Sequence, residues 1–324
     1  MLTQGWMMCV VIVVVVLCVM TDQRSGHALK EVRRLQEPST PIASLHFSPS
    51  SPWLASCETG GRLSLWKLPA TAPVQECGGE DRKIKCVAFS PIREQVAWGD
   101  WDGTIVLWDL RTRTQLEVLQ LGEASISALE FSPGGTTLAA GDASGAVGLW
   151  DVEEGRVMGV LETQARLITA LDFSSDGRLI AAAGVDDSGG RLMTWEAPGG
   201  TPRRQFPLPS RSLVRTIEFL PGDDRVLWLD VGRQRLGSWD LARGESDVML
   251  DERHRLTSVA LSPDGRTLAL GTSEGGVHLR DRETLEVTHR LRSQPNPIQS
   301  LDFSADGRLV AVGGVVAGVL VWAP

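Results

Sequence analysis

The chain has 324 residues, of which 42% are hydrophobic and 22% are charged, and its formal net charge is -8. This balance supplies a core and excludes a disordered or collagen-like chain. Only four of the 32 basic residues are lysines, and the acidic balance disfavours nucleic acid as the main partner, because nonspecific nucleic-acid affinity needs basic surface. The five scattered cysteines form no Cys-x-x-Cys pair, which argues against a disulfide scaffold or a metal knuckle.

The first feature along the chain is an uninterrupted apolar run at residues 6–20. As a helix it would span about 22 Å, short of the roughly 30 Å core of a bilayer, and this length favours the core of a signal peptide. No lysine or arginine precedes the run, whereas Arg24, Lys30 and Arg33 follow it, so the positive-inside rule favours an anchor with the rest of the chain in the cytoplasm. The third interpretation is a misplaced start codon: translation from Met20 would leave out the apolar run.

We therefore expect residues 1–27 to be an apolar anchor or signal with a short linker, and residues 28–324 to be the folded domain. The expected localisation is membrane-anchored with a cytoplasmic domain. The alternatives are a periplasmic or secreted protein after signal cleavage, and a cytosolic protein if the start codon is misplaced. Cys57, Cys77 and Cys86 are an odd number on separate segments, which favours reduced thiols and a cytoplasmic domain.

A repeat of about 42 residues fills the chain after residue 28. An apolar anchor recurs seven times, at Phe47, Phe89, Phe131, Phe173, Phe219, Leu261 and Phe303. A second anchor follows each of them by 19 to 22 residues, at Trp66, Trp108, Trp150, Trp195, Trp239, Arg280 and Trp322. Between anchors the apolar residues alternate with period two, and Ser-Asp-Gly or Asp-Gly turns punctuate them, so each copy predicts a set of short strands joined by hairpins.

Four strands per copy, a period near 42 and the Trp-Asp pairs at Trp108-Asp109, Trp150-Asp151 and Trp239-Asp240 resemble the WD-repeat β-propellers. The resemblance covers residues 28–324 and implies an all-β, seven-bladed β-propeller of four-stranded antiparallel blades. Val32 and Leu35 have the spacing of an outer strand, while the chain ends just after the last tryptophan strand. We therefore expect the N-terminal strand to pair with the last blade and close the ring.

The sequence departs from the family pattern in three ways. None of the seven copies has the Gly-His dipeptide whose imidazole joins a buried hydrogen-bonded set, so the blades are expected to rely on apolar packing. The sixth copy has Leu261 and Arg280 in place of both anchors, and the fourth carries extra residues near Asp186. These two copies are predicted to be the least regular. With 28 arginines against four lysines and no tyrosine, we expect a bacterial-type member.

No catalytic, cofactor or metal site emerges from the motifs. Gly271-Thr-Ser-Glu-Gly275 matches a hydrolase pattern, but that pattern needs a strand before it and a helix after it, whereas here it predicts a hairpin turn. Carboxylates recur directly before four of the first anchors and are expected near the channel, at Glu130, Asp172, Glu218 and Asp302. We predict no enzyme activity, no cofactor and no small-molecule substrate.

We therefore predict that the protein acts by binding partners on its surface. In the family, partners dock on the face that holds the b–c and d–a loops of each blade. Trp101 is expected at the tip of a hairpin turn on this face, and exposed tryptophans are enriched at interface hot spots. The candidate partner-binding residues are Trp101, an acidic patch of Glu58, Asp100, Asp102 and Asp142, and the more basic Arg253, His254 and Arg255.

The resemblance implies a non-catalytic protein-protein interaction scaffold, tethered near a membrane if residues 6–20 are retained. The acidic patch predicts a protein partner with a basic segment. The alternatives are an extracytoplasmic binding protein, if the N-terminus is cleaved, and a propeller enzyme with a site at the channel mouth.

Overall fold

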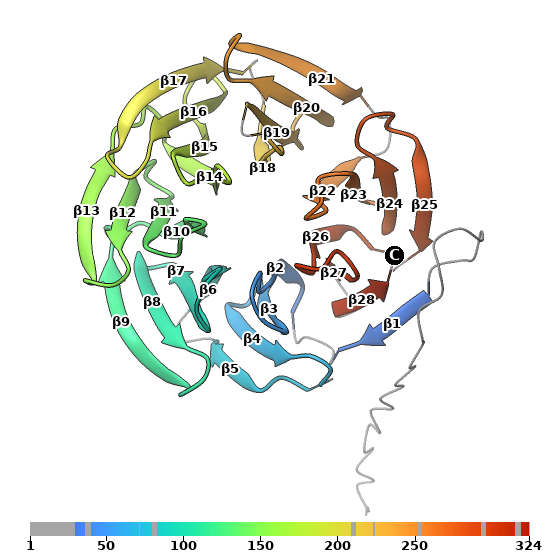
Figure 1. Ribbon diagram of the computed structural model, residues 1–324, viewed down its shortest axis with the longest axis horizontal. Coiled ribbons are helices and arrows are strands. Elements are labelled where there is room, and N and C mark those ends of the chain that lie inside the picture. The colour runs from blue at the N-terminus through green and yellow to red at the C-terminus, as the bar shows by residue number, and fades with distance from the viewer. Residues whose placement is uncertain are drawn as a thin grey trace, which may run out of the picture.

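Seven antiparallel sheets of four strands each are arranged in a ring (Figure 1). The computed structural model describes residues 30–35, 40–70, 72–79, 83–208, 212–222, 224–251, 255–292, 296–314 and 319–323. These residues form strands and turns and contain no helix. The predicted all-β fold, a propeller of seven four-stranded blades, is confirmed.

Each blade begins with its innermost strand. Blade one consists of β2 (Ile42–Phe47), β3 (Trp53–Glu58), β4 (Arg62–Lys67) and β5 (Gln75–Gly78), and blade two of β6 (Ile84–Phe89), β7 (Gln95–Asp100), β8 (Thr104–Asp109) and β9 (Thr114–Gln120). Blade three consists of β10 (Ile126–Phe131), β11 (Thr137–Asp142), β12 (Val147–Asp151) and β13 (Arg156–Leu161), and blade four of β14 (Leu167–Phe173), β15 (Leu179–Val185), β16 (Gly190–Glu196) and β17 (Thr201–Pro207).

The remaining blades repeat the plan. Blade five consists of β18 (Val214–Phe219), β19 (Arg225–Asp230), β20 (Arg235–Asp240) and β21 (Glu245–Asp251), and blade six of β22 (Leu256–Leu261), β23 (Thr267–Thr272), β24 (Gly276–Asp281) and β25 (Val287–Arg292). Blade seven consists of β26 (Ile298–Phe303), β27 (Val310–Gly314), β28 (Val319–Ala323) and β1 (Lys30–Arg34).

The first strand of the chain closes the ring. β1 pairs antiparallel with β28, with Lys30 opposite Ala323 and Arg34 opposite Leu320, and so becomes the outer strand of blade seven. Figure 1 shows β1 at the outer edge beside the C-terminal strands. The predicted closure is confirmed. It covers an edge of β28 that would otherwise expose unpaired backbone groups.

The innermost strand of every blade contains the same irregularity. Its pairing register shifts near the start of the strand, for example between Ile84 and Cys86 in β6 and between Val214 and Thr216 in β18. Equivalent shifts occur in β2, β10, β14, β22 and β26. An extra, unpaired residue of this kind is a β-bulge, which bends the strand and re-aims side chains. The bulge residue lies four positions before each first anchor.

The hydrophobic core lies between blades rather than within them. Seven apolar clusters each combine residues of two adjacent blades. In the cluster between blades three and four, for example, Leu149 packs with Ile180 and Trp195. Both faces of each blade meet a neighbouring blade, and for this reason inner strands such as β3 and β11 are buried along their whole length. Each blade is therefore held in place by the blades on either side of it.

The tryptophan anchors pack mainly as apolar side chains. Trp150, Trp195 and Trp239 are buried, and Trp239 meets Phe206 edge-on with ring centroids 3.7 Å apart. Trp66 donates a hydrogen bond to Ser56 Oγ over 3.0 Å. Nε1 of Trp108 and Nε1 of Trp239 find no hydrogen-bond partner among the described residues.

The two copies predicted to be least regular form complete four-stranded sheets. In blade six, Arg280 stands in the tryptophan position and donates a hydrogen bond to the Leu285 carbonyl oxygen over 2.8 Å. In blade four, the extra residues form a turn in which Asp186 binds the backbone N–H of Ser188 and the guanidinium of Arg191. Local polar contacts thus replace the missing anchor and accommodate the insertion.

The predicted membrane-anchored localisation requires correction. A helix that crosses a bilayer needs about 20 predominantly apolar residues, and within the part of the chain that the structure describes no helix is long and apolar enough to do so. The proposed anchor at residues 6–20 lies outside the described residues. The localisation was wrong on this finding and is not carried further.

Candidate functional site

Trp101 lies at the tip of the turn between β7 and β8 and is 52% exposed. Its backbone N–H donates to the Lys83 carbonyl oxygen over 3.1 Å, and the Lys83 ammonium stands 5.4 Å from the centre of its ring. This cation–π contact ties the indole to the loop that enters blade two. Trp101 is therefore an exposed aromatic side chain with a defined position, as the sequence predicted.

Three acidic side chains of the predicted patch are buried. Glu58, Asp100 and Asp142 end the second strands of blades one, two and three and are 4%, 3% and 1% exposed. Asp142 Oδ1 accepts hydrogen bonds from the backbone N–H groups of Ser144 and Ala146, each over 2.9 Å. Asp100 Oδ1 accepts from the N–H groups of Asp102 and Thr104, over 3.0 and 2.9 Å.

Glu58 instead holds the loop that enters blade one, because its Oε2 accepts from the backbone N–H of Thr40 over 2.9 Å. A hairpin turn leaves backbone N–H groups without a ladder partner, and short acidic side chains are suited to bind them. Asp100 and Asp142 thus hold turns in place, and Glu58 holds a loop. The expected acidic patch is thereby corrected, since its exposed acid is Asp102, beside Trp101.

The basic candidates lie elsewhere in the ring. Arg255 is exposed at the start of blade six, across the ring from blade two, and its carbonyl oxygen accepts the Ser273 N–H over 2.9 Å. Arg253 and His254 lie outside the described residues. The structure thus brings Trp101, Asp100 and Asp102 together in one turn and places Glu58, Asp142 and Arg255 on other blades.

On the loop face, Leu213 is the other large apolar side chain that is strongly exposed among the described residues, at 41%.

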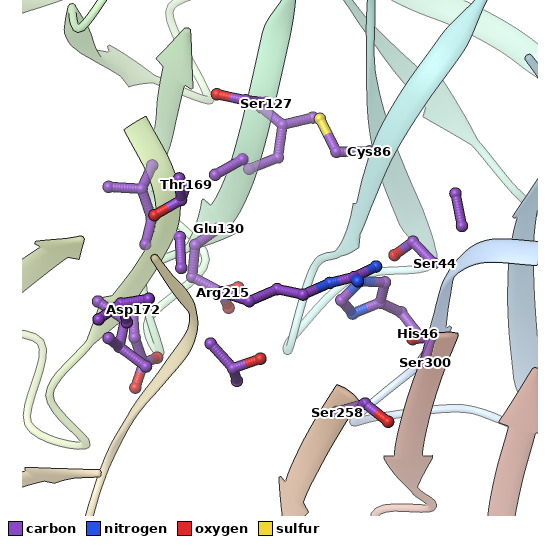
Figure 2. A pocket seen from close by; sticks show the side chains of 18 of the residues that line it. Ser44, His46, Cys86, Ser127, Glu130, Thr169, Asp172, Arg215, Ser258 and Ser300 are labelled. Carbon is purple, nitrogen blue, oxygen red and sulfur yellow. The ribbon is translucent and has the colours of Figure 1, made fainter. Parts of the chain in front are cut away.

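The central channel contains a cavity of about 680 Å³, lined by the innermost strands of all seven blades. Two positions of each strand supply most of its charge. The residue directly before the first anchor contributes His46, Glu130, Asp172, Glu218 and Asp302, and the bulge residue contributes Lys85 and Arg215. Figure 2 shows several of these side chains around the pocket. The prediction that the four recurring carboxylates lie near the channel is confirmed.

Three of these carboxylates join neighbouring blades. Asp172 Oδ2 accepts the backbone N–H of Phe219 over 2.5 Å, and Glu218 Oε2 accepts that of Leu261 over 3.0 Å. Asp302 Oδ2 accepts the N–H of Phe47 over 2.6 Å. In each case the acceptor lies one residue before an anchor and the donor is the anchor of the next blade. The recurrence seen in the sequence therefore has a structural cause.

The channel disfavours charge on its acidic side chains. Burial raises the pKa of Asp302 to about 7, although the N–H groups of Phe47 and Phe303 act in the opposite direction. Burial, reinforced by Asp172, Asp302 and Glu218, raises the pKa of Glu130 well above its usual value. Burial also lowers the pKa of His46 to about 4, so its imidazole is neutral at pH 7. Each shift reflects loss of water around the ionised form.

Arg215 and Lys85 are site residues that the sequence reasoning missed. Both occupy the bulge position, where the other copies have the uncharged residues Ala43, Ser127, Thr169, Thr257 and Gln299. Figure 2 shows Arg215 extending from β18 across the pocket toward the side where His46 and Ser44 lie. The signal in the sequence was a charged residue, in two of the seven copies, at a position that is uncharged in the other five.

No group of three or more histidine, cysteine, aspartate or glutamate side chains among the described residues could hold a metal ion.

Comparison with known families bears on the repeats. The model described as "WD domain, G-beta repeat" matches residues 29–67 and 71–109, and the model described as "Anaphase-promoting complex subunit 4 WD40 domain" matches residues 107–176. Together with the ring of seven blades, these matches support a WD-repeat β-propeller. The WD-repeat fold suggests that the protein binds other proteins.

Curated relatives resemble only part of the WD-repeat propeller. This chain is 32% identical over 85 residues to "Telomerase protein component 1" of Mus musculus. It is 29% identical over 85 residues to the protein of the same name in Rattus norvegicus. Each match covers 26% of this chain and 3% of the relative. The similarity therefore extends over about two repeats of a much longer protein.

Proposed function

We propose that the protein is a non-catalytic scaffold that binds a partner protein on the loop face, with Trp101 as the central contact and Asp102 beside it. The observation that carries the proposal is the exposure of Trp101 at 52% on a turn that is held in place by hydrogen bonds to the buried Asp100 carboxylate. A large aromatic side chain on a rigid turn loses little conformational entropy on binding, which is the usual property of a hot spot.

The partner segment is expected to be basic. Asp102 is exposed beside the indole, while the Lys83 ammonium is already engaged over the ring. A basic residue of the partner would pair with Asp102 and compete with Lys83 for the face of Trp101. The charge on Asp102 then affects mainly the rate of association and its dependence on salt, whereas the indole determines dissociation.

Photocrosslinking at two matched positions tests the proposal. A photoreactive amino acid replaces Asp102 in one protein and Ile92 in another, because Ile92 is 56% exposed in the loop between β6 and β7, at the opposite end of the blade. We expect one protein to be captured from position 102 and not from position 92. With that partner purified, Trp101→Ala should weaken binding by about 2 kcal/mol, and Asp102→Lys should slow association.

Two results would contradict the proposal. The first is equal capture from both positions. The second is an affinity for the captured protein that Trp101→Ala leaves unchanged.

A further inference from the structure

Two basic side chains enter the central channel without an acidic partner. Arg215 and Lys85 both line the cavity of about 680 Å³. Within the described part of the chain, neither side chain forms a hydrogen bond or an ion pair. The bulge that precedes Cys86 and Thr216 explains why both side chains point into the channel, because the bulge residue stands outside the hydrogen-bonded ladder.

Three of the four channel carboxylates bind backbone groups rather than Arg215. Asp172, Glu218 and Asp302 direct their oxygens to backbone N–H groups of the next blade. Burial alone lowers the pKa of the Arg215 guanidinium, and no carboxylate acts to raise it. The Arg215 side chain is exposed to the channel, and its guanidinium N–H donors have no acceptor among the described residues, so they are available to bind a ligand.

An anion would supply acceptors for these donors. A guanidinium presents paired N–H donors that match the oxygens of a carboxylate or a phosphate, and an ammonium adds a second positive charge. The cavity volume lies within the range of about 300 to 1,000 Å³ that small-molecule sites occupy. Thr216 and Gln299 contribute a hydroxyl and an amide to the same lining.

We propose that the central channel binds a small organic anion, whose carboxylate or phosphate group is held by Arg215 and Lys85. This site is separate from the loop-face contact at Trp101, and each can fail without the other. Glu130, Glu218 and Asp302 line the same cavity. Their raised pKa values reduce the negative charge that a bound anion would meet.

Isothermal titration of the full chain at pH 7 and low ionic strength tests the site. The probes are inorganic phosphate, succinate and citrate, with putrescine as a cationic contrast. We expect at least one of the three anions to bind at a single site, and the responding probe identifies the class of group. Arg215→Gln should weaken binding tenfold or more, and Lys85→Gln severalfold. Arg266→Gln, a change at an exposed arginine in the turn before β23, should bind as the wild type does.

Three results would overturn the assignment: none of the three anions binds, Arg215→Gln binds them as tightly as the wild type, or putrescine binds in their place. Circular dichroism verifies that each variant folds. Arg215 has no described hydrogen bond to lose, and Lys85→Gln supplies an independent variant of the same site. Trp101→Ala should leave anion binding unchanged, which separates this proposal from the scaffold function.

Discussion

The Asp302 carboxylate accepts the backbone N–H of Phe47 over 2.6 Å and so joins the last blade to the first. The two residues lie at opposite ends of the repeat array, and their contact repeats the one that Asp172 makes with Phe219 inside the array. Ring closure therefore uses a side-chain bond at the channel wall as well as the pairing of β1 with β28 at the outer edge.

Replacing Asp302 with alanine should lower the free energy of unfolding by about 1–3 kcal/mol, because the N–H of Phe47 is left without its acceptor. Urea denaturation monitored by tryptophan fluorescence gives the value. Asp247→Ala, on the exposed outer strand β21, is the control and should change stability by less than about 0.5 kcal/mol. Equal effects of the two variants would show that the contact with Phe47 does not stabilise the ring.

Glu130→Gln should make the protein more stable at high pH. Because the folded-state pKa of Glu130 is raised, the folded protein binds more protons than the unfolded chain above the unfolded pKa of about 4.5. The contribution of Glu130 to the free energy of unfolding therefore falls as pH rises from about 4.5 toward the folded pKa. The glutamine variant removes this loss.

The measurement is the difference in stability between Glu130→Gln and wild type at pH 4, 6 and 8. We expect the difference to be small at pH 4 and to grow in favour of the variant at pH 6 and 8. Taking the difference cancels the contribution of titrating groups that do not interact with Glu130, including His46, whose lowered pKa acts in the opposite direction between pH 4 and 6.5. A difference that does not change with pH contradicts the assignment. Glu117→Gln, on the exposed strand β9, is the matched control.

Asp142 and Asp102 should respond differently to the same substitution. Asp142→Ala removes the acceptor for the N–H groups of Ser144 and Ala146 and should cost about 2 kcal/mol of stability. Asp142→Asn keeps an oxygen in that place and should cost less. Asp102→Ala, on the exposed side of a neighbouring turn, should leave the melting temperature almost unchanged. Differential scanning calorimetry of the three variants checks this order, and a destabilised Asp102→Ala would contradict it.

Gly145→Ala should strongly destabilise blade three. Gly145 has a φ of +90°, and a Cβ placed on it would lie 1.9 Å from the Ala165 carbonyl oxygen. Both the backbone conformation and the contact oppose a side chain, so we expect a loss of about 2 kcal/mol or more. Gly159→Ala, where a Cβ meets nothing within 4 Å, is the control and should be close to neutral. Similar unfolding curves for the two variants would refute the prediction.

The fold could be predicted from the sequence because its signals repeat. Phe47, Trp66 and their equivalents recur at nearly constant spacing, and each repeat faces the same packing problem between two neighbours. The closing strand was predictable as well, since Val32 and Leu35 have the spacing of an outer strand without a blade before them. Blade six kept its four strands without its usual anchors because its apolar residues still share one packed cluster with blade seven and another with blade five.

The site was predicted only in part. Trp101 was placed correctly at an exposed turn, but the burial of Asp100 and Asp142 was not foreseen. Sequence alternation indicates which way a strand residue points, whereas it does not show whether a carboxylate at a strand end turns back to bind the N–H groups of its own hairpin. Arg215 was missed for a related reason, because period two does not reveal a bulge, and the bulge directs this side chain into the channel.

The pairing of β1 with β28 also sets an order of events in synthesis. The ribosome releases β1 before any blade exists, yet the strand that β1 pairs with is the last of the ring to emerge. Until then β1 has no sheet to join, and blade seven lacks its outer strand. Assembly of the ring is thus completed only after translation of β28, and β1 remains available to chaperones or to foreign strand edges throughout that interval.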